Sequence, residues 1–264
     1  MTLRRRILFF KWTLWLGGVT AVLALAPALH TSTTYFIPVV ALFVWVTHRR
    51  ASRVIVRGAY RRLRRLIEAE DYAGARALIA ELTALYAGSR SALEGLRLQE
   101  AGVLSHEGRY PEAAALYASL DAGRLGAGWK PLLLNNLAWT LALSGDAPTA
   151  VQRARESLEA SDKTGDRAVG VVDLRSYQLG TLGTALVLAG EPGEGVRLLE
   201  QAFARGGKPR EQAARSFFLG EGLRALGRHE DAAQAYRRAV QLSPACRFGK
   251  RAQASLEGLR AYRS

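Results

Sequence analysis

The sequence predicts an all-α protein in which an N-terminal transmembrane helical hairpin precedes a solenoid of helix pairs. Three observations predict it: two uncharged apolar stretches near the start, a strongly basic segment after them, and a helix–turn–helix pattern that recurs along the rest of the chain. We therefore expect a two-helix membrane anchor at 1–48, a basic juxtamembrane segment at 49–65, about five helix pairs at 66–246 and a C-terminal capping helix at 247–264.

The two apolar stretches predict membrane spans over about 7–29 and 31–47. From Trp12 to Leu29 the first stretch holds 18 uncharged residues, which is about the shortest length at which an apolar helix crosses a bilayer. The second stretch is shorter, with aromatic residues near both ends, where they favour the membrane–water interfaces. Together the two stretches predict a hairpin joined by a short uncharged loop.

The positive charge of the chain is concentrated at this end. Residues 1–65 contain 12 Lys and Arg and no acidic residue, whereas 66–264 contain 25 basic and 23 acidic residues, so that part carries only +2 of the formal net charge of +14. Such local charge is typical of a topology signal and argues against nucleic acid as the partner. Both basic flanks favour the cytoplasm, so we expect the repeats to face it. Because Arg greatly outnumbers Lys, we expect a GC-rich bacterial source and hence the bacterial inner membrane.

A cleaved signal peptide is the alternative interpretation of the first stretch. Arg4–Arg6 would be its basic region, Leu14–Leu25 its apolar core, and Ala24–Ala26 or Ala26–Ala28 its cleavage motif. The second stretch would then be a lone anchor, again with the repeats in the cytoplasm. The repeats would lie outside only if the second stretch does not span, and the chain would then be an envelope assembly or quality-control factor.

The basic juxtamembrane segment has two interpretations. It is either a topology signal that runs into the first repeat helix, or an interfacial helix held by anionic lipid at about 1 kcal/mol per basic residue. The basic residues concerned are Arg49, Arg50, Arg53, Arg57, Arg61, Arg62, Arg64 and Arg65.

The helix-pair pattern is clearest at 216–244. The first helix carries Gly220, a turn follows at 227–229, and the second helix carries Ala232, Tyr236 and Ala239 and stops at Pro244. These residues resemble the tetratricopeptide repeat (TPR), a helix–turn–helix unit of about 34 residues. The resemblance implies a TPR-like α-solenoid, in which each unit buries its apolar face against the next.

The pattern recurs at similar spacing. Turns are predicted at 70–72, 108–110, 145–147, 190–192 and 227–229, with spacings of 38, 37, 45 and 37 residues. The position of Gly220 is taken by Leu63, Ala101, Ala138 and Gly183 in the earlier units, and that of Ala232 by Ala75, Ala113, Ala150 and Gly195. The last two units match the family best and the first matches it least. The interruption at 161–175, which accounts for the longest spacing, either lengthens two helices or forms a loop.

The sequence predicts neither an enzyme nor a cofactor-dependent protein. The glycines at 180–183 and 220–222 lie inside helical patterns rather than after a strand, so we expect packing glycines and no phosphate loop. No nucleophile-elbow, Walker or zinc-protease motif is found. The single Cys246 and four scattered histidines provide no disulfide and no metal-ligand spacing.

The TPR resemblance instead implies that a partner protein binds in the concave groove formed by the first helix of each unit. The family's groove-facing positions correspond here to Leu98, Asn135, Asn136, Trp139, Tyr177, Thr184, Phe217, Glu221 and Arg224. The asparagines would hydrogen-bond a peptide backbone and the aromatic residues would hold apolar anchors. Trp139 and Phe217 are equally consistent with the core. The chain is thus expected to be a membrane-anchored, non-enzymatic scaffold, similar in layout to bacterial inner-membrane proteins with two N-terminal spans before a repeat array.

Overall fold

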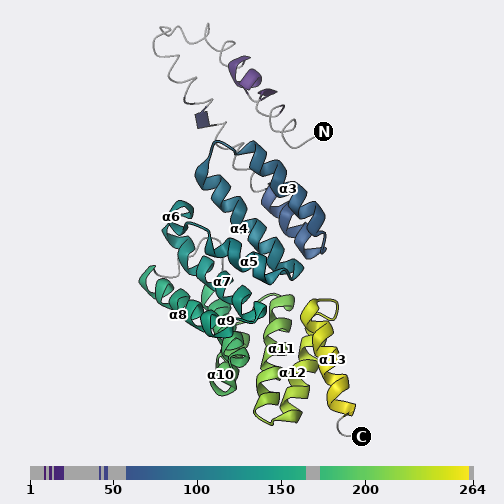
Figure 1. Cartoon of the computed structure of the whole chain (residues 1–264). Coiled ribbons are helices and arrows are strands. Elements are labelled where there is room, and N and C mark those ends of the chain that lie inside the picture. Colours follow the sequence, from purple (N-terminus) through teal and green to yellow (C-terminus); the bar gives the residue numbers. More distant parts are fainter. Residues whose placement is uncertain are drawn as a thin grey trace. The chain divides into compact units, whose positions relative to one another are not determined.

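The structure is a computed structural model that describes residues 9, 12–13, 15–20, 42, 45–46, 58–164 and 173–261. All regular secondary structure in these residues is helical (Figure 1), which confirms the predicted all-α fold. Most of the predicted spans at 7–29 and 31–47 lies outside the described residues, as do Arg49, Arg50, Arg53 and Arg57. Among the helical residues that are described, no helix combines the length and apolar character needed to cross a membrane.

The chain divides into two compact units, Met1–Ser89 and Arg90–Ser264. In the first unit, residues 58–68 are helical, and after a turn α3 follows over Tyr72–Leu85. Asp71 caps α3, because its carboxylate accepts a hydrogen bond of 2.8 Å from the Gly74 N–H. Leu63 on the first helix and Ile79 on α3 are both buried, so this helix pair has an apolar core.

In the second unit, the described residues 90–164 and 173–261 form four helix pairs and one final helix. The pairs are α4 (Arg90–Glu107) with α5 (Tyr110–Ala118), α7 (Lys130–Ser144) with α8 (Ala147–Thr164), α9 (Leu174–Leu188) with α10 (Pro192–Ala204), and α11 (Pro209–Ala225) with α12 (His229–Leu242), followed by α13 (Arg247–Ala261). The short α6 (Ala122–Leu125) and the 3-10 helix η2 (Ala127–Trp129) connect the first two of these pairs. In α5, α7, α10 and α11 a proline lies in the first turn, where its missing N–H removes no helical hydrogen bond.

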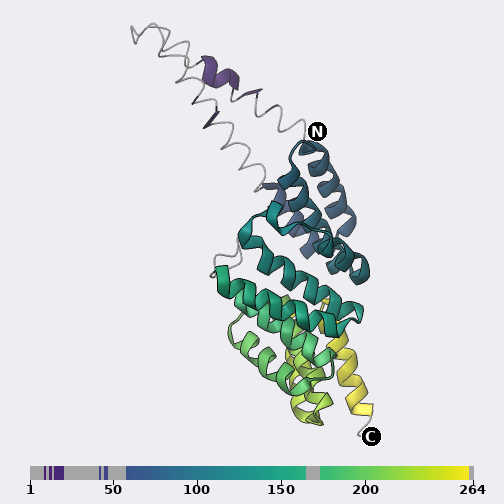
Figure 2. The same cartoon turned by 60° about the vertical axis from the view of Figure 1, so that its left-hand side comes forward.

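Each second helix of the second unit packs on the first helix of the next pair (Figures 1 and 2). Thus α5 contacts α7, α8 contacts α9, α10 contacts α11, and α12 contacts α13. The first helices also contact one another in the order α7, α9, α11 and α13. The unit therefore has two layers, and we call the layer of α7, α9, α11 and α13 the inner helices. The predicted interruption begins as an extension of α8, which reaches Thr164.

The turns inside the five pairs share one backbone conformation. The turn residue has a positive φ in each pair, at Glu70, Gly108, Gly145, Gly190 and Gly227. The next N–H donates to the carbonyl of a leucine five residues earlier at 2.9–3.0 Å, and the five leucines are Leu66, Leu104, Leu141, Leu186 and Leu223. This hydrogen bond is typical of a helix C-terminus that ends in the left-handed region, where glycine is favoured. Glu70 is the exception in the least regular pair.

Glycine also sets the helix contact in the last two pairs. A Cβ on Gly183 would lie 2.9 Å from the Gly195 carbonyl oxygen, and one on Gly220 would overlap the ring of Tyr236. A larger residue at either position would force the two helices apart. The small residues predicted at the helix contact therefore allow the two helices of these pairs to pack closely.

Candidate partner-binding site

The structure places four of the nine predicted groove residues in the core. Leu98 and Asn135 are 4% exposed, and Thr184 and Phe217 are 1% exposed. A side chain this deeply buried does not reach a partner, so these four are core residues in this conformation. Thr184 and Phe217 are buried because α9 and α11 are enclosed by neighbouring helices along most of their length. Leu98 and Asn135 lie among the buried residues of α4 and α7.

Trp139 and Phe217 belong to a cluster of rings on the inner helices. Trp139 of α7 lies edge-on to Phe218 of α11 and to Phe248 of α13, with centroid distances of 5.9 and 5.8 Å. Phe217 lies 5.1 Å from Phe218 and 5.8 Å from Phe248. We call Trp139, Phe217, Phe218 and Phe248 the aromatic cluster. The two aromatic residues predicted to anchor a partner are thus engaged by the chain itself.

Tyr177 remains half-buried at the start of α9. Its hydroxyl donates to Glu211 Oε1 at 2.7 Å, and the Arg215 guanidinium lies 5.6 Å from its ring centroid. Burial and the hydrogen bond to the Glu211 carboxylate raise the pKa of Tyr177 well above its usual value. Glu211 also accepts from the Lys208 N–H at 3.0 Å, so Tyr177 is held against the N-terminus of α11.

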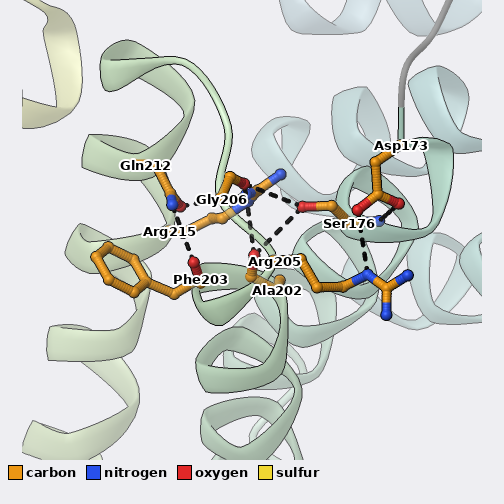
Figure 3. A network of polar contacts seen from close by, with 8 residues as sticks. All are labelled: Asp173, Ser176, Ala202, Phe203, Arg205, Gly206, Gln212 and Arg215. Atoms are coloured by element: carbon orange, nitrogen blue, oxygen red, sulfur yellow. Dashed lines mark hydrogen bonds and ion pairs between the residues drawn. The ribbon is translucent and has the colours of Figure 1, made fainter.

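A buried polar network next to Tyr177 joins α9, α10 and α11 (Figure 3). Arg215 is 6% exposed, and its Nη1 donates to the carbonyl oxygens of Ala202 and Gly206 at 3.1 and 2.6 Å. Ser176 Oγ contacts the same two carbonyls, and Gln212 Nε2 donates to the carbonyl of Phe203 at 3.0 Å. These donors bind carbonyl oxygens at the end of α10 and just after it, and the Phe203 carbonyl also accepts from the Gly206 N–H at 3.0 Å.

This network was not predicted from the sequence, although Gly180 next to it was predicted to be a packing glycine. A Cβ on Gly180 would lie 3.0 Å from Arg215 Nε, so this glycine makes room for the guanidinium. Burial lowers the pKa of Arg215. The network is a structural joint between two helix pairs, and it leaves Arg215 turned into the protein rather than toward a ligand.

Glu221, Arg224 and Asn136 are the remaining predicted groove residues. Glu221 Oε1 accepts from the Tyr236 hydroxyl at 2.6 Å, and its Oε2 accepts from Arg224 Nη2 at 3.2 Å. Asn136 is half-buried and hydrogen-bonds the buried Tyr117 hydroxyl. Arg224 is the most exposed of the nine residues. The accessible part of the predicted groove therefore consists of Arg224 with the partly exposed Asn136, Trp139, Tyr177 and Glu221.

The first unit has a separate basic surface. Arg61, Arg62, Arg64 and Arg65 are exposed on the helix at 58–68, while Leu63 of the same helix is 1% exposed. The helix is therefore amphipathic, with its arginines directed to solvent.

The residue types that bind metals do not cluster in the described part of the chain. No group of three His, Cys, Asp or Glu side chains there is placed to hold a metal ion. Cys246 is buried, and its Sγ accepts a hydrogen bond of 3.3 Å from the Gly249 N–H at the start of α13. The position of this thiol is that of a helix cap.

Comparison with known proteins supports the fold. No family model matches the sequence, and no curated protein is similar to it. The structure is similar to a crystal structure of a point variant of a Podosopora anserina protein described as a putative kinesin light chain with nearly identical TPR-like repeats (18% identity, 72% of this chain, 94% of that chain, TM-score 0.50). The corresponding structure without the substitution has 18% identity, coverages of 72% and 95%, and a TM-score of 0.49.

A further similar structure is BtubC (BKLC) from P. vanneervenii, with 17% identity over 94% of this chain and 92% of that chain and a TM-score of 0.49. At such identities a likeness extends to the fold alone. The likeness with a TM-score of 0.50, together with the repeated helix pairs, gives the chain a TPR-like helical-repeat fold, as the sequence resemblance implied.

Proposed function

We propose that this protein is a non-enzymatic scaffold, anchored in the bacterial inner membrane and presenting its repeat array to a partner protein in the cytoplasm. The TPR-like array is the observation that carries the proposal. Stacked helix pairs provide an extended surface built from many similar elements, and proteins of this architecture use such surfaces for binding. Tethering to a membrane raises the local concentration of the array, so weak affinity for the partner suffices.

The anchor part of the proposal rests on the sequence and on the first helix. Two uncharged stretches, at about 7–29 and 31–47, have the length and composition of spans, and basic residues flank both ends of the hairpin. The exposed arginines at 61–65 continue this charge onto a folded helix. Close to a bilayer they would add about 1 kcal/mol each through anionic lipid.

Topology reporters test the anchor and the location. Fusions after Ser264 of one reporter that is active only in the cytoplasm and another that is active only outside should show cytoplasmic activity alone. Carbonate washing should leave the full-length chain in the membrane fraction. Activity of the outside reporter alone would contradict the proposal and favour the envelope assembly or quality-control factor.

Site-specific photo-crosslinking in cells tests the partner surface. A photoreactive residue at Arg224 or Tyr177 should give a discrete crosslinked species, because these side chains remain accessible on the inner helices. The matched control is Glu159, an exposed residue on α8 in the other layer. Equal crosslinking at all three positions, or at Glu159 alone, would contradict binding by the inner helices.

A further inference from the structure

The start of α13 contacts helices that are far away in the sequence. Phe248 lies 5.8 Å from Trp139 of α7, measured between ring centroids, and 5.3 Å from Phe218 of α11. The Arg251 guanidinium covers the Phe217 ring at 4.5 Å. In a stack where α7, α9, α11 and α13 follow one another, contact between the first and fourth of these helices means that the inner face has curled closed.

A second contact ties the same turn of α13 to the turn between α4 and α5. Arg247 Nη1 donates to the Tyr110 hydroxyl at 2.8 Å, and the guanidinium lies 5.0 Å from the centroid of that ring. A Cβ on Gly108 would overlap the guanidinium, so the glycine of this turn both permits its positive φ and makes room for Arg247. The first helix pair of the second unit, through Tyr110 of α5, is therefore joined side chain to side chain to α13.

These contacts are not needed to cap the array. Ala252 and Leu256 bury the apolar side of α13, and Leu259 packs beside them, which is what a terminal helix requires. Arg247, Phe248 and Arg251 lie on the first turn and just after it, and that first turn has no acidic residue. Positive charge at a helix N-terminus opposes the helix dipole. The first helical turn of α13 is thus held in place by side-chain contacts with other helices rather than by a favourable interaction with the helix dipole.

We infer that the first turn of α13 is a latch that closes the inner face of the second unit through Arg247 and Phe248. When the latch releases, α13 moves away from α7 and from the α4–α5 turn, and Trp139, Phe217 and Phe218 become accessible. The structure is the closed state. The regulatory consequence, that a partner gains these rings only after release, rests on the proposed function, but the latch itself does not.

Distance measurement in the full-length chain tests the latch without any partner. Spin labels at Ala115→Cys on α5 and Ala254→Cys on α13 replace exposed alanines on the two sides of the closing contact. Cys246→Ser removes the native thiol while keeping a hydrogen-bond acceptor for the Gly249 N–H. The labelled parent should give one narrow distance distribution by pulsed electron paramagnetic resonance.

Two variants release the latch to different extents. Phe248→Ala should raise the population at longer distance about tenfold, because it removes several ring contacts. Tyr110→Phe keeps the ring but loses the hydroxyl, and it should raise that population about threefold. Arg237→Ala, which removes an exposed arginine from the neighbouring α12, is the control and should match the parent.

Coincident distributions for the parent, Phe248→Ala and Tyr110→Phe would overturn the latch. Circular dichroism of each variant checks that helicity is kept. If Phe248→Ala loses helicity, Tyr110→Phe alone decides the result. Because no partner enters this experiment, failure of the latch and failure to capture a partner by photo-crosslinking are separate outcomes.

Discussion

The first helix pair, at 58–85, and the last pair, α11 with α12, form the same turn from different residues. The turn residue has φ 59° at Glu70 and 73° at Gly227. In both pairs the next N–H donates at 2.9 Å to a leucine carbonyl, at Leu66 and Leu223. The backbone geometry is therefore preserved even where the residue that usually permits it is absent.

The two pairs differ in how they fill the contact between their helices. The last pair places Gly220 against the large ring of Tyr236. The equivalent positions of the first pair are Leu63 and Ile79, two buried residues of intermediate size. In the last pair a glycine lies against a large ring, in the first pair both positions hold residues of intermediate size, and the turn geometry is the same in both. Cores tolerate such exchanges when the total volume is conserved.

Exchanging the contact residues between the pairs should have the largest effect. Gly220→Leu introduces a side chain where the Tyr236 ring already lies, so the free energy of unfolding should fall by about 3 kcal/mol. Gly220→Leu combined with Tyr236→Ile recreates the first pair's residues and should recover at least about half of that loss. Urea unfolding of the full-length chain measures both. A double variant no more stable than Gly220→Leu alone would show that the contact residues of the first pair cannot replace those of the last pair.

The joint that connects the last pair to the preceding one gives the next largest effect. Arg215→Met should lower the free energy of unfolding by about 2 kcal/mol, because the buried carbonyls of Ala202 and Gly206 lose the guanidinium and share only the Ser176 hydroxyl. The matched control is Arg205→Met, which removes a half-exposed ion pair of 3.2 Å to Asp173 and should change stability by less than about 0.5 kcal/mol. Similar losses for the two variants would show that the buried network adds nothing beyond an exposed ion pair.

The turn residues should give a smaller effect of opposite sign in the two pairs. Glu70→Gly should stabilise the chain by about 1 kcal/mol, because a residue with a Cβ is strained at positive φ. Gly227→Glu should destabilise it by a similar amount. Thermal and urea unfolding measure the two changes. Destabilisation by Glu70→Gly would mean that contacts of the glutamate outweigh its backbone strain.

The Tyr117 hydroxyl should have a small effect on stability at neutral pH, and this effect should diminish in alkali. It occupies in the second pair the position of Tyr236, and burial raises its pKa well above the usual value. The folded state therefore keeps the neutral phenol, whereas the unfolded chain ionises it near pH 10. Its contribution to stability is complete below about pH 10 and is lost as the pH rises further.

The Tyr117→Phe variant isolates this contribution. At pH 7 it should lose about 1 kcal/mol with the hydrogen bond to Asn136. Above about pH 10 the difference between parent and variant should shrink, since only the parent carries the ionising phenol. A difference that stays constant from pH 7 to 11 would show that this hydroxyl ionises equally in the folded and unfolded states.

The repeated elements of the fold were predictable because they depend on local sequence. Each of the five predicted turns, from Glu70 to Gly227, contains a residue with positive φ. The next N–H in each turn donates to a leucine carbonyl at the end of the first helix. Glycine at a helix end and small residues at fixed offsets are signals that a single repeat contains. The TPR-like fold follows from their recurrence.

The candidate site was less predictable because it depends on contacts between distant repeats. Family positions place Phe217 and Trp139 in an open groove, but Phe248, which lies 109 residues after Trp139, fills the space between the inner helices. The periodicity within one repeat does not determine the curvature of the stacked helix pairs. The buried Arg215 was missed for a related reason, since its partners are carbonyl oxygens of another pair.

Native-state hydrogen exchange on the full-length chain compares the first and last pairs most directly. Amides of α11 lie in a helix buried along most of its length and joined to α9 through Arg215, whereas α3 belongs to a pair whose turn is strained at Glu70. We expect α11 to exchange at least about 100-fold more slowly than α3, because local opening costs more where more surface is buried. Equal protection of α3 and α11 would contradict the view that the last pairs of the array are more stable against local opening than the first pair.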